Sequence, residues 1–288
     1  MLVEGRAINI SRNQLLADIK RILKRYNLRA FKKYSQNFVI DPKLIAWHIQ
    51  YSDLNEGDRV VEIGAGLGTL TKYLAEKAEK VYAIEFDSKL IQVLQEELAS
   101  YNNIEIILGD ILKLNSEIFE GTKIISNPPY KISSPLTFKI IQSAYILSVL
   151  TYQKEFAERM VAVPGTKKYG RITVGVQYYA KVEYLKPIPK SFFYPMPKVD
   201  SALIRLTPIK PPFELDDEND FFDFVRHLFS FRNKSVKRAV SLYLKHHEFT
   251  GIPEEKIKQM ELTNQRIFRL SLQQFYELYQ IIRGLKGI

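Results

Sequence analysis

The sequence predicts an α/β protein with a doubly wound, mostly parallel sheet, followed by a small C-terminal domain that is all-helical. Between residues 59 and 161, short apolar runs alternate with segments of helical periodicity, which is typical of strands joined by helical crossovers. Beyond residue 220 only helical periodicity remains. A chain of 288 residues with 46% apolar content is long enough to bury one such domain and a smaller one.

The expected elements follow one another in the order that a parallel sheet requires. Strands are expected at residues 59–63, 81–85, 104–108, 123–126 and 146–152. Helices are expected at residues 13–26, 42–51, 69–78, 88–100, 135–143 and 154–161, the second of them capped by Asp41 with Pro42 in its first turn. Residues 181–186 and 201–207 favour an antiparallel hairpin at the sheet edge. In the C-terminal part, helices are expected at residues 221–231, 236–244 and 272–282.

Three segments are expected in the domain organisation. Residues 1–30 form a basic helical extension, residues 31–209 the α/β domain, and residues 210–288 the helical domain. Prolines and five acidic residues within residues 208–220 indicate a linker between the last two.

The formal net charge of +10 is concentrated at the two ends of the chain. Residues 1–40 contain nine Lys and Arg against two Asp and Glu, a net charge of +7. Residues 221–288 contain 12 against six, a net charge of +6, whereas residues 41–220 contain 21 against 24. Basic ends favour a polyanionic partner, because each neutralised phosphate releases counterions. A solvated lysine-rich surface is the alternative that charge alone leaves open.

Composition argues against several classes of protein. The chain has no cysteine, so it has neither disulfides nor thiolate metal sites. Its four histidines, His48, His227, His246 and His247, show no zinc-ligand spacing, and we expect no metal. No apolar stretch reaches the roughly 18–20 residues of a membrane span, and residues 1–12 lack the apolar core of a secretory signal. We therefore expect a cytoplasmic protein without a membrane partner, and a monomer by default.

A glycine-rich turn follows the first expected strand. Residues 60–68 read VVEIGAGLG, with glycine at positions 64, 66 and 68. Such glycines let the backbone turn tightly and approach a ligand closely. Nicotinamide and flavin enzymes use a related loop, and a plain strand-to-helix turn is the alternative without a function. The loop alone therefore does not identify its ligand.

Acidic residues end the next two strands. The carboxylate of Glu85 can accept hydrogen bonds from two ribose hydroxyls, and a side-chain oxygen of Asp110 can meet an adenine amine. A single acid at a strand end is more often a cap or a solvated loop residue. Three such features at successive strand ends, however, favour one cofactor site.

The most specific motif is Asn127-Pro128-Pro129-Tyr130, directly after the strand expected at residues 123–126. Two consecutive prolines fix the backbone, so that the Asn127 side-chain oxygen and the Pro128 carbonyl can both accept from one amine. Tyr130 offers a flat face for a heterocycle. Paired acceptors draw a planar amine toward tetrahedral geometry and stabilise the positive charge that develops during methyl transfer. A proline-rich surface turn is the alternative.

These motifs resemble those of class I amino-methyltransferases that depend on S-adenosylmethionine (AdoMet). Further segments resemble one family in particular, the ribosomal RNA adenine dimethyltransferases of the KsgA type, from about residue 30 to about residue 275. The segments are SQNFV at 35–39, YKISSP at 130–135, QKEFAER at 153–159, YGR at 169–171 and FYPMPKVDS at 193–201. Ser35 stands where the family usually has glycine, Pro128 where many members have leucine, and the basic helix before residue 30 is longer than in the shortest members.

The resemblance implies a cofactor site with a Rossmann-like methyltransferase fold around it. Asn37 and Val39 would border the AdoMet pocket, and Gly64 would lie at its loop. Glu85 would bind the ribose of AdoMet, and Asp110 its adenine.

The resemblance also implies a target site and a substrate. Asn127 would bridge cofactor and target amine, with Pro128 as second acceptor, and Tyr130 and Phe193 would stack on opposite faces of the target base. Family members transfer two methyl groups to each of two adjacent adenosines near the 3′ end of small-subunit ribosomal RNA. This implies small-subunit ribosomal RNA and the assembling small ribosomal subunit as partners, and a role in ribosome biogenesis.

Basic residues near both ends are expected to bind RNA phosphates, which positions the RNA more than it specifies a sequence. They are Arg226, Arg232, Lys234, Lys237 and Arg238 near the C-terminal end, and the cations between Lys20 and Lys33 near the N-terminal end. His48 is expected to lie on a helix surface or to be structural, and the chemistry needs no strong general base, because a methylated amine loses its proton readily.

Two other functions stay open on sequence alone. The chain could methylate another amine, such as DNA adenine, a different ribosomal site or a protein glutamine. It could also act chiefly as a ribosome-assembly or RNA-binding factor. The intact motif at residues 127–130 and the glycine-rich loop favour an active enzyme.

Overall fold

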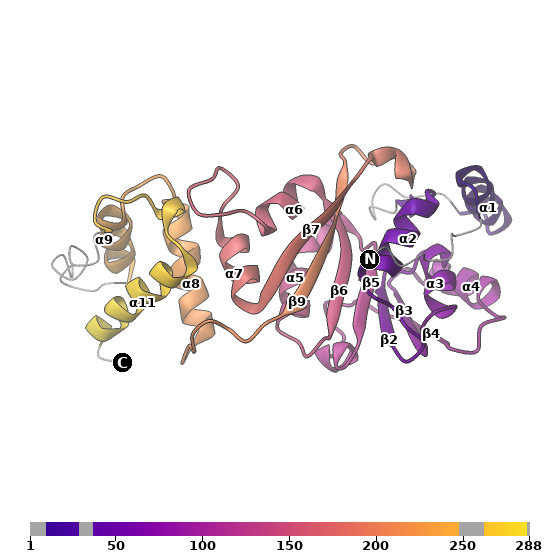
Figure 1. Ribbon diagram of the computed structural model, residues 1–288, viewed down its shortest axis with the longest axis horizontal. Coiled ribbons are helices and arrows are strands. Elements are labelled where there is room, and N and C mark those ends of the chain that lie inside the picture. Colours follow the sequence, from indigo (N-terminus) through magenta and orange to yellow (C-terminus); the bar gives the residue numbers. More distant parts are fainter. Residues whose placement is uncertain (1–9, 29–36, 248–261, 287–288) are drawn as a thin grey trace, which may run out of the picture. The chain divides into compact units, whose positions relative to one another are not determined.

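The computed structural model describes residues 10–28, 37–247 and 262–286 (Figure 1). The chain divides into two compact units. The first comprises Met1–Ala157 and Tyr179–Ile209, and the second comprises Glu158–Tyr178 and Lys210–Ile288.

The first unit is built on a seven-stranded sheet with the order β4-β3-β2-β5-β6-β9-β7. Its strands are β2 (Arg59–Ile63), β3 (Lys80–Glu85), β4 (Ile104–Leu108), β5 (Lys123–Ser126), β6 (Leu147–Gln153), β7 (Ala180–Ile188) and β9 (Ser201–Pro208). The strands from β2 to β6 pair parallel to one another, and β9 is antiparallel to both β6 and β7. The predicted doubly wound sheet with an antiparallel edge hairpin is therefore confirmed.

The strand order reverses between β2 and β5. From β2 the chain builds outward to β3 and β4, and then returns to place β5 on the other side of β2. In open α/β sheets, ligands bind beyond the carboxyl ends of the strands at such a reversal. The fold thus places the glycine-rich turn after β2 and the residues after β5 beside one another.

Helices cover the sheet of the first unit (Figure 1). The helices of this unit are α1 (Arg12–Arg25), α2 (Pro42–Tyr51), α3 (Thr69–Ala75), α4 (Ser88–Glu97), α5 (Ser133–Ile141) and α6 (Lys154–Met160, whose residues from Glu158 belong to the second unit). The side chains of Asp41 and Asp87 accept hydrogen bonds from the backbone of Lys43 and Lys89, which caps α2, as expected, and also α4. Because helices lie on both faces, Val60, Val61 and Ile63 of β2 are all at most 1% exposed. Burial of each such side chain contributes about 1.5–3 kcal/mol.

Helix α1 lies within the basic helical extension that the sequence predicted at residues 1–30, and it packs into the first unit. Ser11 and Gln14 form a capping box at its start. Its apolar stripe is buried, with Leu15 in one core cluster and Ile19 and Ile22 in another that includes Phe38. Amphipathic periodicity shows that a helix has a partner, but not which surface the partner offers.

A two-stranded sheet joins two segments that lie far apart in the sequence. Strand β1 (Phe38–Val39) pairs antiparallel with β8 (Phe193–Tyr194), so that Val39 lies opposite Phe193. The backbone amide of Ile40 extends the contact by donating to the carbonyl of Phe192 at 2.8 Å. The sequence did not predict this sheet, because a two-residue strand has no periodicity to detect.

The second unit is helical, as predicted. Its described helices are α7 (Arg171–Tyr179, whose last residue belongs to the first unit), α8 (Glu218–Ser230), α9 (Val236–His246) and α11 (Leu272–Lys286). Their core includes Phe221, Phe224, Leu228, Val240 and Tyr279. None of the described helices in either unit is both long and apolar enough to cross a membrane.

The second unit contains more of the chain than the sequence predicted. Residues 158–178 belong to it, because Ala162, Tyr169 and Val174 join its core. Helix α7 was not predicted at all. The expected linker at residues 208–220 also packs there in part, since the ring of Phe213 stacks on Tyr276 at 4.0 Å between centroids. Part of its acidic run starts α8, with Asp217 as N-cap and two acids in the first turn.

Candidate functional site

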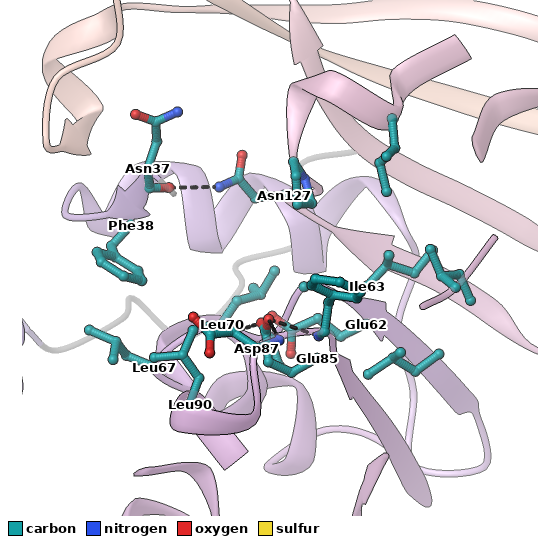
Figure 2. A pocket seen from close by; sticks show the side chains of 18 of the residues that line it. Asn37, Phe38, Glu62, Ile63, Leu67, Leu70, Glu85, Asp87, Leu90 and Asn127 are labelled. Atoms are coloured by element: carbon teal, nitrogen blue, oxygen red, sulfur yellow. Dashed lines mark hydrogen bonds between the residues drawn. The ribbon is translucent and has the colours of Figure 1, made fainter. Parts of the chain in front are cut away.

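A cavity of about 390 Å³ lies where β2, β3, β4 and β5 end (Figure 2). All six residues predicted to bind the cofactor line it: Asn37, Val39, Gly64, Glu85, Asp110 and Asn127. They come from segments spread over 90 residues of sequence, between positions 37 and 127. The parallel sheet brings them together because all its parallel strands end at the same edge.

The glycine-rich turn has the conformation that its sequence predicted. Gly64, Gly66 and Gly68 all have positive φ values, 77°, 62° and 77°. A Cβ added at Gly64 would lie 3.1 Å from Cδ of Pro129, and one added at Gly66 would lie 3.3 Å from the Phe38 ring. Both glycines therefore allow the tight turn. In addition, Gly64 allows the close approach of the motif at residues 127–130, and Gly66 that of β1.

The carboxylate of Glu85 holds the glycine-rich turn in place. One oxygen, Oε2, accepts from the backbone amide of Gly66 at 2.9 Å. The other, Oε1, accepts from the amides of Phe86 and Asp87 at 2.8 and 2.9 Å. Burial raises the pKa of Glu85 above its ordinary value, and the three amide donors oppose that rise. Oε2 accepts only one of these bonds, so it can also accept from a hydroxyl of a ligand, whereas both lone pairs of Oε1 are already used.

Asp110 lies in the turn after β4. Its Oδ1 accepts from the backbone amide of Leu112 at 3.0 Å, which fixes the side chain in an Asx turn. The residue lines the cavity and is partly exposed. Asp110 therefore both stabilises its own turn and lines the cavity. Its local structural role and its predicted role in ligand binding are compatible.

Glu62 is a site residue that the sequence motifs did not indicate. It belongs to β2, lines the cavity and is 3% exposed, and its Oε2 has no hydrogen-bond partner. Burial, with the negative charge of Glu85 adding to it, raises the pKa of Glu62 to about 8. The sequence did contain a signal for Glu62, since it is an acid inside the apolar run VVEI. Burying an acid costs free energy, so an acid that is retained in a buried strand indicates a function.

The side chain of Asn127 meets the backbone of Asn37 across the cavity from the acidic side chains. Figure 2 shows this pair on one side and Glu62, Glu85 and Asp87 on the other. The Nδ2 of Asn127 donates to the backbone carbonyl of Asn37 at 3.0 Å. Its Oδ1 is buried and has no hydrogen-bond partner. The bond to a carbonyl fixes which end of the amide is the donor, so an acceptor remains for a ligand.

Pro128 and Tyr130 lie beside the cavity rather than in its lining. Pro128 is buried, and Tyr130 is partly exposed with its hydroxyl 2.6 Å from Oγ of Ser201. Burial raises the pKa of Tyr130 to about 12, although the hydrogen bond with Ser201 opposes the rise. The hydroxyl is therefore neutral at physiological pH, and it anchors the ring to the first residue of β9.

Phe193 is not brought to the cavity. Its ring is 2% exposed and belongs to the core cluster that includes Leu15, Leu44 and Val60. The pairing of β1 with β8 nevertheless places its backbone opposite Val39, which does line the cavity. Stacking on a base would require this ring, or what covers it, to move, so the role of Phe193 stays a prediction.

His48 is structural. It is fully buried, with Nδ1 at 2.9 Å from the carbonyl of Leu44 and Nε2 at 3.2 Å from both the Ser126 carbonyl and Oγ1 of Thr151. Burial lowers the pKa of His48 to about 4. The neutral ring ties α2 to the end of β5, directly before Asn127.

Several cations expected to bind phosphate are already engaged. In the second unit, Arg232 donates to the carbonyls of Lys167 and Thr166, and Arg226 pairs with Asp223 at 3.0 Å. Lys234, Lys237 and Arg238 lie around the start of α9, and the first and last of them are exposed. Arg232 is thus better described as structural than as a phosphate ligand.

In α1 of the first unit, Arg21 and Arg25 each lie within 3.7 Å of a carboxylate oxygen of Glu97. Lys20 and Lys24 on the same helix are exposed. The expected basic residues Arg29, Lys32 and Lys33 lie outside the described residues, as do Ser35 and Gln36.

The sequence matches a known protein family over nearly its whole length. The family model for ribosomal RNA adenine dimethylase matches residues 27–283. A protein of Thermococcus gammatolerans, "Probable ribosomal RNA small subunit methyltransferase A", is 41% identical over 91% of this chain and 92% of its own length. A protein of the same name from Methanosarcina mazei is 39% identical over 93% of this chain and 98% of its own length.

Solved structures agree with this match. A dimethyladenosine transferase from Plasmodium falciparum has a TM-score of 0.74 and is 28% identical, covering 85% of this chain and 97% of its own. The 23S rRNA methyltransferase ErmE has a TM-score of 0.64 at 24% identity over 85% of this chain and 98% of its own, which shows a shared fold. On sequence and fold together, the chain belongs to the ribosomal RNA adenine dimethylase family.

Proposed function

We propose that this protein transfers two methyl groups to the exocyclic amine of each of two adjacent adenosines near the 3′ end of small-subunit ribosomal RNA. Family membership makes it an rRNA adenine dimethyltransferase with AdoMet as its methyl donor. The relatives named after the small ribosomal subunit support RNA of that subunit as the substrate. The positions of the two adenosines, a cytoplasmic location and action as a monomer on an assembling subunit are parts of this proposal.

The cavity has the chemistry that AdoMet requires. Four acidic side chains line it, those of Glu62, Glu85, Asp87 and Asp110, against one cation, Lys131, and of the four Glu62 has a pKa raised to about 8. AdoMet carries a sulfonium and an ammonium group, and a site rich in carboxylates favours such a ligand. Apolar side chains complete the lining, which suits the adenine ring. When bound, AdoMet supplies an electrophilic methyl group, and the protein positions the amine that receives it.

The observation that carries the proposal is the unpartnered Oδ1 of Asn127. A buried acceptor without a donor costs roughly 1–3 kcal/mol, so its retention calls for a ligand that donates to it. An adenine amine is such a donor. The turn at residues 127–130 would then present this oxygen and the Pro128 carbonyl to the two amine hydrogens. Both acceptors stabilise the positive charge that develops on the nitrogen.

Orientation supplies the rest of the catalysis. A flipped or unpaired adenine would stack on Tyr130, whose ring is anchored through Ser201. Holding the amine in line for attack can contribute several kcal/mol to the lowering of the barrier. His48 is buried against backbone carbonyls and takes no part, and the methylated nitrogen can lose its proton to water.

RNA binding is assigned mainly to cations that have no strong structural partner. The exposed Lys234 and Arg238 near the start of α9, and Lys20 and Lys24 on α1, meet this condition in the described residues. They would hold phosphates and so position the RNA, while the cavity selects the base.

The test is incubation of the protein with labelled AdoMet and small ribosomal subunits that lack this modification, followed by mapping of the modified nucleotides. We expect N6,N6-dimethyladenosine at two adjacent positions near the 3′ end of the RNA. Label on free RNA alone would argue against the assembling subunit as the substrate. Label on DNA or on protein, with none on the subunit RNA, would overturn the proposal.

A further inference from the structure

Three of the four histidines of the chain meet in the second unit. His227 lies on α8, His246 is the last residue of α9, and His247 caps that helix. One ring nitrogen from each lies within 4.8 Å of the other two. The ring centroid of His246 lies 5.1 Å from those of both His227 and His247. The sequence did not predict this cluster, because 18 residues separate His227 from His246 and no local spacing joins them.

The Nε2 atom of His227 lacks the partner that a buried ring nitrogen ordinarily has. It is buried and has no hydrogen-bond partner, although the residue as a whole is partly exposed. A buried polar atom of this kind costs roughly 1–3 kcal/mol. The two exposed imidazoles beside it, those of His246 and His247, can turn toward the same point.

The surroundings of the cluster are compatible with a cation. The cluster lies at the carboxyl end of α9, where unpaired carbonyl groups place negative partial charge. Arg226, the cation next to His227 in the chain, is paired with Asp223 at 3.0 Å. Lys245 is exposed and can extend into solvent. Aromatic rings cover one side, with the Tyr243 ring 4.4 Å from that of His247.

We propose that His227, His246 and His247 bind one divalent transition-metal ion of the zinc type, which links α8 to α9. Imidazole nitrogen suits Zn²⁺, Ni²⁺ and Cu²⁺, whereas Mg²⁺ and Ca²⁺ require oxygen ligands. Three imidazoles and a water molecule complete a tetrahedral zinc site. Zinc–nitrogen distances of about 2.0–2.1 Å place ligand nitrogens roughly 3.4 Å apart, so small rotations of the two exposed rings close the site.

A metal there has a structural consequence. It would join residues of two helices whose packing against each other depends on Phe224 and Tyr243, among others. A ligand that binds only the folded form raises the melting temperature, by an amount that grows with the logarithm of one plus the ratio of ligand concentration to Kd. The site is therefore expected to stabilise the helical unit, and it is independent of methyl transfer at the cavity.

The test uses the full chain without an affinity tag, freed of metal by chelator and titrated with Zn²⁺ by calorimetry. We expect one equivalent to bind and the melting temperature of the helical unit to rise. His227→Ala and His246→Ala should each weaken zinc binding at least roughly tenfold, because even partners outside the ligand shell are worth 10–100-fold in affinity. Lys245→Ala is the matched control, since it changes the same helix end and keeps all three imidazoles.

Two results would overturn this proposal. One is the lack of saturable one-to-one zinc binding by the wild-type protein. The other is His246→Ala binding zinc as tightly as Lys245→Ala does. His246 is exposed, so its substitution leaves the fold intact, which far-ultraviolet circular dichroism of the metal-free variant checks.

Discussion

The side-chain amide of Asn127 donates a hydrogen bond to the main-chain carbonyl of Asn37, across a distance of 3.0 Å. This contact joins the strand end that carries the proposed target site to the segment that leads into β1. It also orients the amide so that Oδ1 is left buried and unpartnered. Because Asn37 lines the same cavity, a ligand there would contact both residues. The amide nitrogen of Asn127 thus makes a structural hydrogen bond, and the amide oxygen is left to accept from a ligand.

The hydrogen bond between Ser201 and Tyr130 is expected to increase kcat and to have no effect on the affinity for AdoMet. Ser201→Ala removes the anchor of the Tyr130 hydroxyl, and Tyr130→Phe removes the same bond from its other end while keeping the ring. Each substitution should lower kcat about tenfold and leave the affinity for AdoMet unchanged. The reason is that a Tyr130 ring that is no longer fixed orients the target base less well for the reaction.

A double-mutant cycle checks this role. If the bond positions the ring, the double variant should be no slower than either single variant. Additive reductions in rate would show that Ser201 acts in some other way.

Replacement of Glu85 by alanine should weaken AdoMet binding at least tenfold and lower stability. The substitution leaves the amides of Gly66, Phe86 and Asp87 without their acceptor, and each unsatisfied amide costs roughly 1–3 kcal/mol. Calorimetric titration with AdoMet measures the affinity. Glu105→Ala on the neighbouring strand β4 is the control, because that side chain is exposed and pairs only with Lys80 among the described ion pairs. Equal affinity in both variants would exclude Glu85 from the cofactor site.

The pH dependence of stability should report on Glu62. Its pKa is about 8 in the folded protein against 4.5 for an ordinary glutamate. Between these values the folded form keeps a proton that the unfolded form has released, so the free energy of unfolding falls as the pH rises from 4.5 to 8. The total decrease is on the order of 5 kcal/mol.

Glu62→Gln should remove most of this decrease. Denaturant unfolding at about pH 5 and about pH 8.5, on either side of most of this titration, compares the variant with wild type, with the exposed Glu105→Gln as control. Wild type should lose more stability than Glu62→Gln over this range. The same pH slope in all three proteins would mean that Glu62 is ionised in the fold.

The three cations around the start of α9 should control the salt dependence of RNA binding. Replacing Lys234, Lys237 and Arg238 by alanine should weaken binding and reduce the slope of log affinity against log salt by about 0.7–0.9 for each phosphate that is no longer neutralised. Replacing Lys77, Lys113 and Lys181 of the first unit gives the same change of charge and serves as control. An unchanged slope in the first variant would assign its three residues to ordinary surface.

Much of the fold and most of the cofactor site follow from local sequence patterns. The strands β2 to β6 and the turn at Gly64 were predicted because apolar runs and glycines determine the backbone structure within a few residues of their own positions. The meeting of Glu85, Asp110 and Asn127 followed in turn from the rule that ligands bind beyond the ends of parallel strands.

Contacts made over long sequence separation were not predictable in this way. The pairing of Val39 with Phe193 involves two short strands without a pattern, and it leaves the Phe193 ring buried where a stacking role was predicted. The meeting of His227 with His246 likewise depends on how α8 packs against α9. Glu62 was within reach of prediction, since an acid in a buried strand is unusual.

Substitution of Asn127 by alanine tests the central claim most directly. Methyl transfer from labelled AdoMet to unmodified small subunits should be abolished in Asn127→Ala, because the acceptor for the target amine is gone, while binding of RNA remains close to that of wild type. Titration with AdoMet and with RNA, beside the rate measurement, separates the catalytic effect from binding. If the variant methylated adenosine at the wild-type rate, Oδ1 of Asn127 would not hold the target amine, and the mechanism proposed for this site would be wrong.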